Sequence, residues 1–196
     1  MAPKRAFIIH GWDGYPEEGW LPWLKKELEA RGFTAVTPAM PNPRKPVISA
    51  WVSFLREQIG TPDAETFLVG HSIGAQAVLR YLETLNTDER IGGAVFVAGW
   101  VTLTPDAYEQ EGDEETAKPW LETPIDWEKA KSHTANFTAI FSDNDPFVPV
   151  ADAGVFREKL GAEVITEKGK GHFSGSDGVT ELPSALEAIL NFTENG

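Results

Sequence analysis

Short apolar runs alternate along the chain with longer segments in which apolar residues recur at helical spacing. The runs are continuous rather than alternating, which is typical of strands buried on both faces of a parallel sheet. This pattern predicts six strands, at Arg5–His10, Thr34–Pro38, Thr66–Gly70, Gly93–Ala98, Thr138–Phe141 and Glu163–Thr166.

The segments between these runs carry apolar stripes that predict amphipathic helices. The stripes lie at Trp20–Leu28, Ile48–Ile59, Ala75–Leu85, Val155–Leu160 and Leu182–Phe192. Gly32 and Gly60 follow the first two stripes, as expected of helix stop signals. Alternation of strands and helices predicts a three-layer α/β fold, with about six mostly parallel strands and helices on both faces, as a single domain over residues 1–196.

Residues 101–135 interrupt this rhythm, because they contain no clear strand pattern. The part from Asp106 to Glu115 is strongly acidic, and Tyr108, Trp120 and Trp127 lie in or after it. Two interpretations stay open: a solvated loop with a short helix whose aromatic side chains pack on the core, or a small cap or insertion over a site. Loops of this length in compact domains are often functional.

Charge and composition exclude several classes of function. Lys and Arg number 17 against 30 Asp and Glu, so the net charge is −13, which disfavours nucleic acid and anionic membranes as partners. No run approaches the ~18 apolar residues of a membrane helix, and the N-terminal apolar stretch is too short for a signal peptide. We therefore expect a cytoplasmic protein that acts on a small molecule. The absence of Cys removes a thiolate as nucleophile or metal ligand, and we expect no metal or cofactor.

The sequence Gly70-His71-Ser72-Ile73-Gly74 lies between a predicted strand and a predicted helix. A serine that follows a buried strand must make a sharp turn to expose its hydroxyl, and glycines are needed where a Cβ would collide with the backbone. The N-terminus of the next helix favours a developing anion beside that hydroxyl. The pattern indicates that Ser72 is a nucleophile; the alternative is an ordinary helix N-cap serine.

A serine nucleophile needs a base, and the chain offers four histidines. His172 follows the last strand in a glycine-rich loop that can bring an imidazole over the carboxyl edge of the sheet. We expect the side chain of His71 to point away from Ser72, and His133 to lie at the solvated surface. His10 ends the first strand. By position, His172 is the candidate base.

The base in turn needs a carboxylate to orient it. Asp143 and Asp145 both follow the fifth strand; we prefer Asp145, which lies deeper in a turn fixed by Pro146, and expect Asp143 to cap the turn. A calcium loop that begins at Asp143 is rejected, because Pro146 interrupts it and Gly154 occupies its twelfth position.

The resulting chain order is Ser72, Asp145, His172, which is the order found on an α/β-hydrolase sheet. An oxyanion would need two backbone donors. We expect them to be the N–H of Ile73, directly after the nucleophile, and the N–H of Trp12 in the loop after the first strand. His10, Gly11 and Trp100 are further candidates for the substrate pocket.

The sequence resembles the RBBP9/YdeN family of serine hydrolases, which are small single-domain α/β hydrolases. The matching pieces cover most of the chain: Ile9-His10-Gly11, the elbow at 70–74, Asp145-Pro146-Phe147-Val148-Pro149, Gly171-His172-Phe173, and the segment from Pro124 to Lys131. The resemblance implies the same three residues, Ser72, Asp145 and His172, as the catalytic triad. The acidic part of residues 101–135 matches no pattern of that family.

These observations predict a serine hydrolase that cleaves small carboxylic esters through an acyl-enzyme, with thioesters and amides as open alternatives because they share one triad. A second hypothesis is a weakly active or inactive hydrolase fold that binds a protein partner, since fold alone does not guarantee activity. A dinucleotide-binding oxidoreductase ranks last, because Gly11-Trp12-Asp13-Gly14 does not match the Gly-x-Gly-x-x-Gly pattern.

Overall fold

The computed structural model describes residues 3–194 and contains one parallel sheet in the order β2-β1-β3-β4-β5-β6. Its strands are β1 (Arg5–Ile9), β2 (Thr34–Val36), β3 (Thr66–His71), β4 (Gly93–Val97), β5 (Phe137–Ser142) and β6 (Glu163–Glu167). Each predicted strand is found to within a few residues. The predicted fold class is therefore confirmed.

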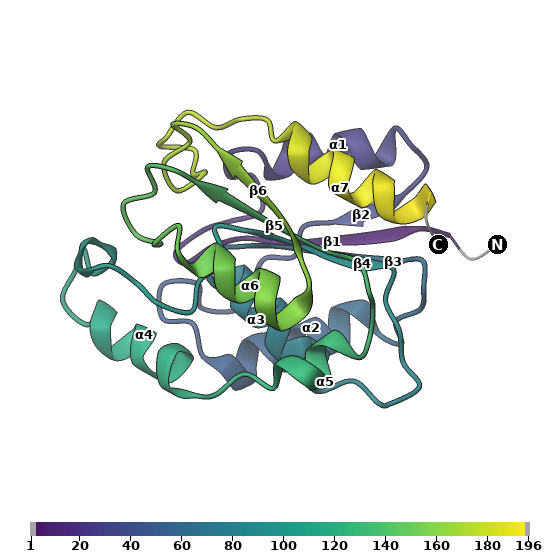
Figure 1. Ribbon diagram of the computed structural model, residues 1–196, viewed down its shortest axis with the longest axis horizontal. Coiled ribbons are helices and arrows are strands. Elements are labelled where there is room, and N and C mark those ends of the chain that lie inside the picture. Colours follow the sequence, from purple (N-terminus) through teal and green to yellow (C-terminus); the bar gives the residue numbers. More distant parts are fainter. Residues whose placement is uncertain (1–2, 195–196) are drawn as a thin grey trace.

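Helices cover both faces of this sheet (Figure 1). On one face lie α1 (Leu21–Glu29) and α7 (Pro183–Glu194). On the other lie α2 (Ile48–Ile59), α3 (Ile73–Glu83), α5 (Trp127–Lys131) and α6 (Asp152–Leu160).

The side chains of β1 show how a continuous apolar strand serves two cores. Phe7 and Ile9 pack with α2 and α3, whereas Ala6 and Ile8 pack with α1 and α7. Successive residues of a strand point to opposite faces, so a strand between two helical layers needs apolar residues at every position. Both apolar clusters are buried against the sheet.

Residues 101–135 contain a 3-10 turn (Pro105–Ala107) and two helices, α4 (Asp113–Glu122) and α5. A short helix in this segment was part of one of the two interpretations of the sequence, which did not give its bounds. Helix α4 starts after Gly112, and its acidic first turn is favourable at a helix N-terminus. Its apolar signal is weak because Ala117 and Trp120 are its only buried apolar residues. Trp120 packs edge-on against Trp51 of α2 and donates from Nε1 to Pro46 O at 3.0 Å.

His133 is buried rather than solvated, contrary to the expectation from the sequence. The Nδ1 of His133 donates to Glu89 O at 2.9 Å, and Ile91 N donates to the backbone carbonyl of His133. The ring thus joins the loop before β4 to the loop before β5. The prediction failed because a single His in a polar segment carries no sign of the surface it packs on.

Asp152 fixes the start of the 101–135 segment. Its buried carboxylate accepts hydrogen bonds from Val101 N at 2.7 Å, from Thr102 N at 2.8 Å and from Thr102 Oγ1 at 2.8 Å. Within residues 3–194 these donors bond to no other side chain. Asp152 therefore holds the segment against the N-terminus of α6.

The substitution Asp152→Ala should lower the free energy of unfolding by about 1–3 kcal/mol, because it removes three hydrogen bonds to a buried carboxylate. Urea unfolding followed by tryptophan fluorescence measures the change. Asp88→Ala, at an exposed carboxylate, is the matched control and should change the free energy by less than about 0.5 kcal/mol. Equal effects of the two substitutions would contradict this role for Asp152.

Candidate active site

Ser72 occupies a strained turn between β3 and α3. Its φ is 54° and its ψ −120°, a conformation that non-glycine residues rarely adopt. A Cβ on Gly70 would lie 2.5 Å from Gly74 O, and one on Gly74 would lie 2.6 Å from Ile9 O, so neither position can hold a side chain. The predicted reason for both glycines in this motif is thus visible as close backbone contacts.

The hydroxyl of Ser72 faces a cavity at the carboxyl edge of the sheet. Its backbone N–H donates to Val97 O at 2.8 Å, which ties the turn to β4. The side chain is 93% buried, being 7% exposed, and within residues 3–194 its Oγ makes no hydrogen bond. The hydroxyl is therefore enclosed but free to react.

His172 and Asp145 are joined by a hydrogen bond of 2.9 Å between Nδ1 and Oδ2. The other carboxylate oxygen of Asp145 accepts from Phe147 N at 2.9 Å and Val148 N at 3.0 Å. Because Nδ1 donates to the carboxylate, the neutral ring leaves Nε2 unprotonated, and Nε2 has no partner in the described part of the chain. His172 lines the same cavity as Ser72.

Asp143, the alternative to Asp145, does not contact His172. Its Oδ1 accepts from Gly169 N at 2.8 Å. Ser142 Oγ accepts from Lys170 N at 3.0 Å and Asn144 Oδ1 from Gly171 N at 2.9 Å. Four consecutive residues, 142–145, thus hold the loop that carries His172, and only Asp145 reaches the imidazole.

The other side of this loop is held by residues that the sequence did not single out. Asp177 Oδ2 accepts from His172 N at 2.9 Å and from Ser174 N at 3.0 Å. Trp20 Nε1 donates to Phe173 O at 3.0 Å. The Gly-Ser-Asp-Gly run after Phe173 could have indicated a turn, but not that Asp177 caps the backbone of His172.

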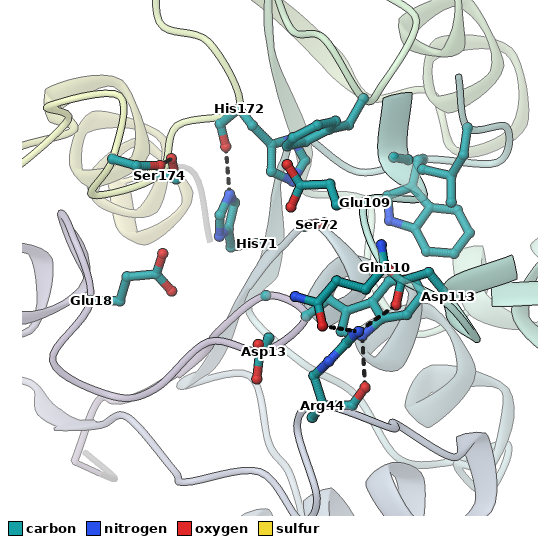
Figure 2. A pocket seen from close by; sticks show the side chains of 17 residues that line it. Asp13, Glu18, Arg44, His71, Ser72, Glu109, Gln110, Asp113, His172 and Ser174 are labelled. Carbon is teal, nitrogen blue, oxygen red and sulfur yellow. Dashed lines mark hydrogen bonds and ion pairs between the residues drawn. The ribbon is translucent and has the colours of Figure 1, made fainter. Parts of the chain in front are cut away.

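The sequence suggested that His71 points away from Ser72, but its side chain faces the site. Its ring lines the cavity 5.1 Å from the ring of His172, and its Nε2 donates to His172 O at 2.7 Å (Figure 2). Burial lowers the pKa of His71 to about 3, with a further decrease from the nearby His172. Alternation of side chains fails here because His71 ends β3 and the chain turns sharply at Ser72.

The N–H groups of Trp12 and Ile73 are both unpaired within residues 3–194. Gly14 N donates to Gly11 O at 3.2 Å, and Asp13 N donates to Pro43 O at 2.9 Å, so the loop bends around the Trp12 N–H. Ile73 is the first residue of α3, where an N–H has no intrahelical acceptor. Both N–H groups are therefore available as donors, and Trp12 lines the cavity.

His10 lies beneath this loop and, unlike the expectation, does not line the cavity. Met40 N donates to its Nε2 at 3.0 Å, so Nδ1 carries the proton and donates to Gly11 O at 2.8 Å. Burial lowers the pKa of His10, which favours this neutral form. Gly11 O and Trp12 N–H belong to one peptide group, so His10 orients the Trp12 N–H.

The cavity has a volume of about 290 Å³. Gly11 and Trp100, both predicted, line it, together with Trp12 and Phe147. The 101–135 segment supplies five further lining residues: Leu103, Ala107, Glu109, Gln110 and Asp113. Elements of both interpretations of this segment are present: Trp120 of α4 packs on the core, and residues between 103 and 113 border the cavity.

Residues 3–194 contain neither a membrane-spanning helix nor a metal-binding cluster of side chains. No helix there is long and apolar enough to cross a membrane. No cluster of three or more His, Asp or Glu side chains in that range is arranged to hold a metal ion.

Comparison with known proteins gives the family. The sequence matches the family described as "Serine hydrolase" over residues 6–191. It is 31% identical over 189 residues to the hydrolase YdeN of Bacillus subtilis (strain 168), covering 96% of both chains. It is 30% identical over 193 residues to the serine hydrolase RBBP9 of Rattus norvegicus, covering 96% of this chain and 97% of that one.

Solved structures agree. The crystal structure of the B. subtilis YdeN product superposes with a TM-score of 0.88 at 29% identity, covering 97% of this chain and 99% of that one. Est1E from Butyrivibrio proteoclasticus, with ferulic acid bound, gives a TM-score of 0.75 at 16% identity, over 99% of this chain and 89% of that one, and shares the fold. The resemblance inferred from the motifs is confirmed: the chain belongs to the serine hydrolase family.

Proposed function

We propose that this protein cleaves small carboxylic esters through an acyl-enzyme intermediate. Ser72 is the nucleophile, His172 the general base, and Asp145 the carboxylate that orients it. The observation that carries the proposal is the 2.9 Å bond between His172 Nδ1 and Asp145 Oδ2, which leaves Nε2 free in the cavity that Ser72 Oγ faces. This is the tautomer that a serine needs from its base.

The reaction would run in two halves. Ser72 Oγ attacks the ester carbonyl carbon while His172 Nε2 takes the hydroxyl proton, and the N–H groups of Trp12 and Ile73 bind the oxyanion. The tetrahedral intermediate collapses, His172 returns the proton to the leaving alkoxide, and an alcohol departs. Water then attacks the acyl-enzyme by the same steps and releases the acid. No cofactor is needed.

The size of the cavity supports small substrates. A volume of about 290 Å³ lies at the low end of ligand sites, which typically span roughly 300–1,000 Å³. We infer that the 101–135 segment acts as a small cap that limits the acyl chain. Thioesters and amides pass through equivalent intermediates and remain alternative substrates. A protein-binding module without activity is the competing function, and labelling of Ser72 separates the two.

Ser72→Ala should abolish hydrolysis of a chromogenic acetate ester and labelling by a fluorophosphonate probe, while circular dichroism stays unchanged. The hydroxyl makes no hydrogen bond within residues 3–194, so its removal should take away the nucleophile without disturbing the fold. Ser53→Ala, at an exposed serine of α2, is the control and should keep both activities. Hydrolysis by Ser72→Ala within tenfold of the wild type would exclude Ser72 as the nucleophile.

Asp145→Asn should lower kcat far more than Asp143→Asn, by up to about 10⁴-fold if a protease triad is a guide. Asn at position 145 would present an amide N–H to His172 and favour the wrong tautomer, whereas Asp143 bonds only to the backbone of the loop. Steady-state kinetics on one ester decides. A larger loss from Asp143→Asn would assign the orienting role to the other carboxylate.

Acid should destabilise the protein through His71. The folded state keeps this imidazole neutral down to about pH 3, whereas the unfolded chain protonates it below about 6.5. In that window the unfolded state binds more protons than the folded state. The free energy of unfolding therefore decreases as the pH is lowered, by at most about 1.4 kcal/mol per pH unit from this group.

His71→Gln removes the titration and keeps an amide N–H that can donate to His172 O. Urea unfolding between pH 7 and pH 4 should therefore show a shallower pH dependence for the variant than for the wild type. The carboxylates of the chain titrate in both proteins and cancel in the difference. Parallel curves would mean that His71 takes up its proton in the folded state as readily as in the unfolded state.

A further inference from the structure

We propose that the cavity selects esters that carry a positive charge, with the ester of a quaternary ammonium alcohol as the simplest case. The inference rests on the proposed esterase function and names a substrate class for it. It is carried by the charges and the aromatic surfaces that surround Ser72.

The charged side chains that line the cavity, within residues 3–194, are four carboxylates and one guanidinium. The guanidinium, Arg44, is neutralised: its Nη2 lies 2.6 Å from Asp113 Oδ1 and 2.8 Å from Gln110 Oε1. The other carboxylates, Asp13, Glu18 and Glu109, form no ion pair in that part of the chain. The cavity thus has an excess of negative charge that no protein cation balances.

These carboxylates come from two segments that meet around the nucleophile (Figure 2). Asp13 and Glu18 lie in the loop after β1, and Glu109 lies in the 101–135 segment after β4. Glu18 is half-buried, and burial raises the pKa of its carboxyl group, while a hydrogen bond from the Gly175 backbone and the nearby His172 act in the opposite direction. Burial thus adds a cost to its negative charge. A bound cation would offset that cost, whereas an anionic substrate would add to it.

The apolar part of the wall fits an organic cation as well. Trp12, Trp100 and Phe147 line the cavity, and aromatic faces attract ammonium groups, quaternary ones in particular. Ser72, a residue that is 93% buried and whose Oγ has no hydrogen-bond partner within residues 3–194, lines the same space. A cation held by this wall would therefore lie in the same cavity as the ester bond that Ser72 attacks.

The test compares two esters that differ only in charge, butyrylcholine and 3,3-dimethylbutyl butyrate, with released acid measured by titration at constant pH. At low ionic strength kcat/KM should be about tenfold higher for the choline ester, from several carboxylates acting at a distance. Added NaCl should reduce the preference, because it screens exposed charges. Equal rates, or a preference for the neutral ester, would overturn the inference.

Single substitutions identify the source of the preference. Glu109→Gln and Glu18→Gln should each reduce the ratio of the two kcat/KM values by about threefold. Glu111→Gln is the matched control: it removes the same charge from an exposed position two residues from Glu109 that does not line the cavity. If Glu111→Gln changed the ratio as much as Glu109→Gln, the preference would come from the net charge of the chain and not from this wall.

Binding can be measured without catalysis, which separates this inference from the proposed function. In Ser72→Ala, tryptophan fluorescence should report tighter binding of choline than of its neutral isostere 3,3-dimethylbutan-1-ol. Comparable affinities would sink the inference even if the wild type is an esterase. Absence of both labelling and hydrolysis in the wild type, with choline still preferred, would instead reject the proposed function and keep the cation site.

Discussion

The site depends on the backbone of Ser72, which is held at a φ of 54° between the sheet and α3. A non-glycine residue in such a conformation costs roughly 1–3 kcal/mol and persists only where its surroundings fix it. Here β3 is buried along its whole length, α3 is buried on nearly every side, and Gly70 and Gly74 allow backbone contacts that no side chain could tolerate. The same turn exposes the hydroxyl and starts α3, so the nucleophile and the free Ile73 N–H come from one distortion.

The rest of the site is attached to this turn through side chains that bond to backbone. Residues 142–144 at the end of β5 bind the N–H groups of the His172 loop, and His71, next to Ser72, binds the carbonyl of His172. The nucleophile and the base are therefore placed by the carboxyl ends of β3 and β5, which lie on either side of β4 in the sheet. In the same way, the side chain of His10 bonds to the backbone carbonyl of Gly11, which belongs to the same peptide group as the Trp12 N–H. The hydrogen-bonded rings of His10, His71 and His172 and the turn at Ser72 thus surround a hydroxyl that itself has no partner in the described residues.

The sequence was informative where a pattern has one physical cause. Continuous apolar runs predicted the strands, and Gly-x-Ser-x-Gly between a strand and a helix predicted the turn at Ser72. Asp145 could be preferred to Asp143 because Pro146 fixes its turn. The positions of three histidines could not be predicted, because each depends on a backbone group far away in the sequence. His71 bonds to the carbonyl of His172, His133 to the carbonyl of Glu89, and His10 to the N–H of Met40. A helix within residues 101–135 was expected only as one of two alternatives, because the two buried apolar residues of α4 make too weak a stripe to fix its bounds.

The place of the 101–135 segment in the chain explains why part of it lines the cavity. It follows β4, which is the neighbour of β3 in the sheet, so any residues inserted there begin beside Ser72. Asp152 fixes the start of the segment, while Arg44 and Pro46, from the stretch between β2 and α2, bond to Asp113 and Trp120 farther along. Being anchored at both sides of the cavity, the segment adds side chains to the wall without disturbing the sheet that positions the nucleophile. Changes in this segment would alter what enters the cavity while leaving the Ser72 turn and the His172 loop in place.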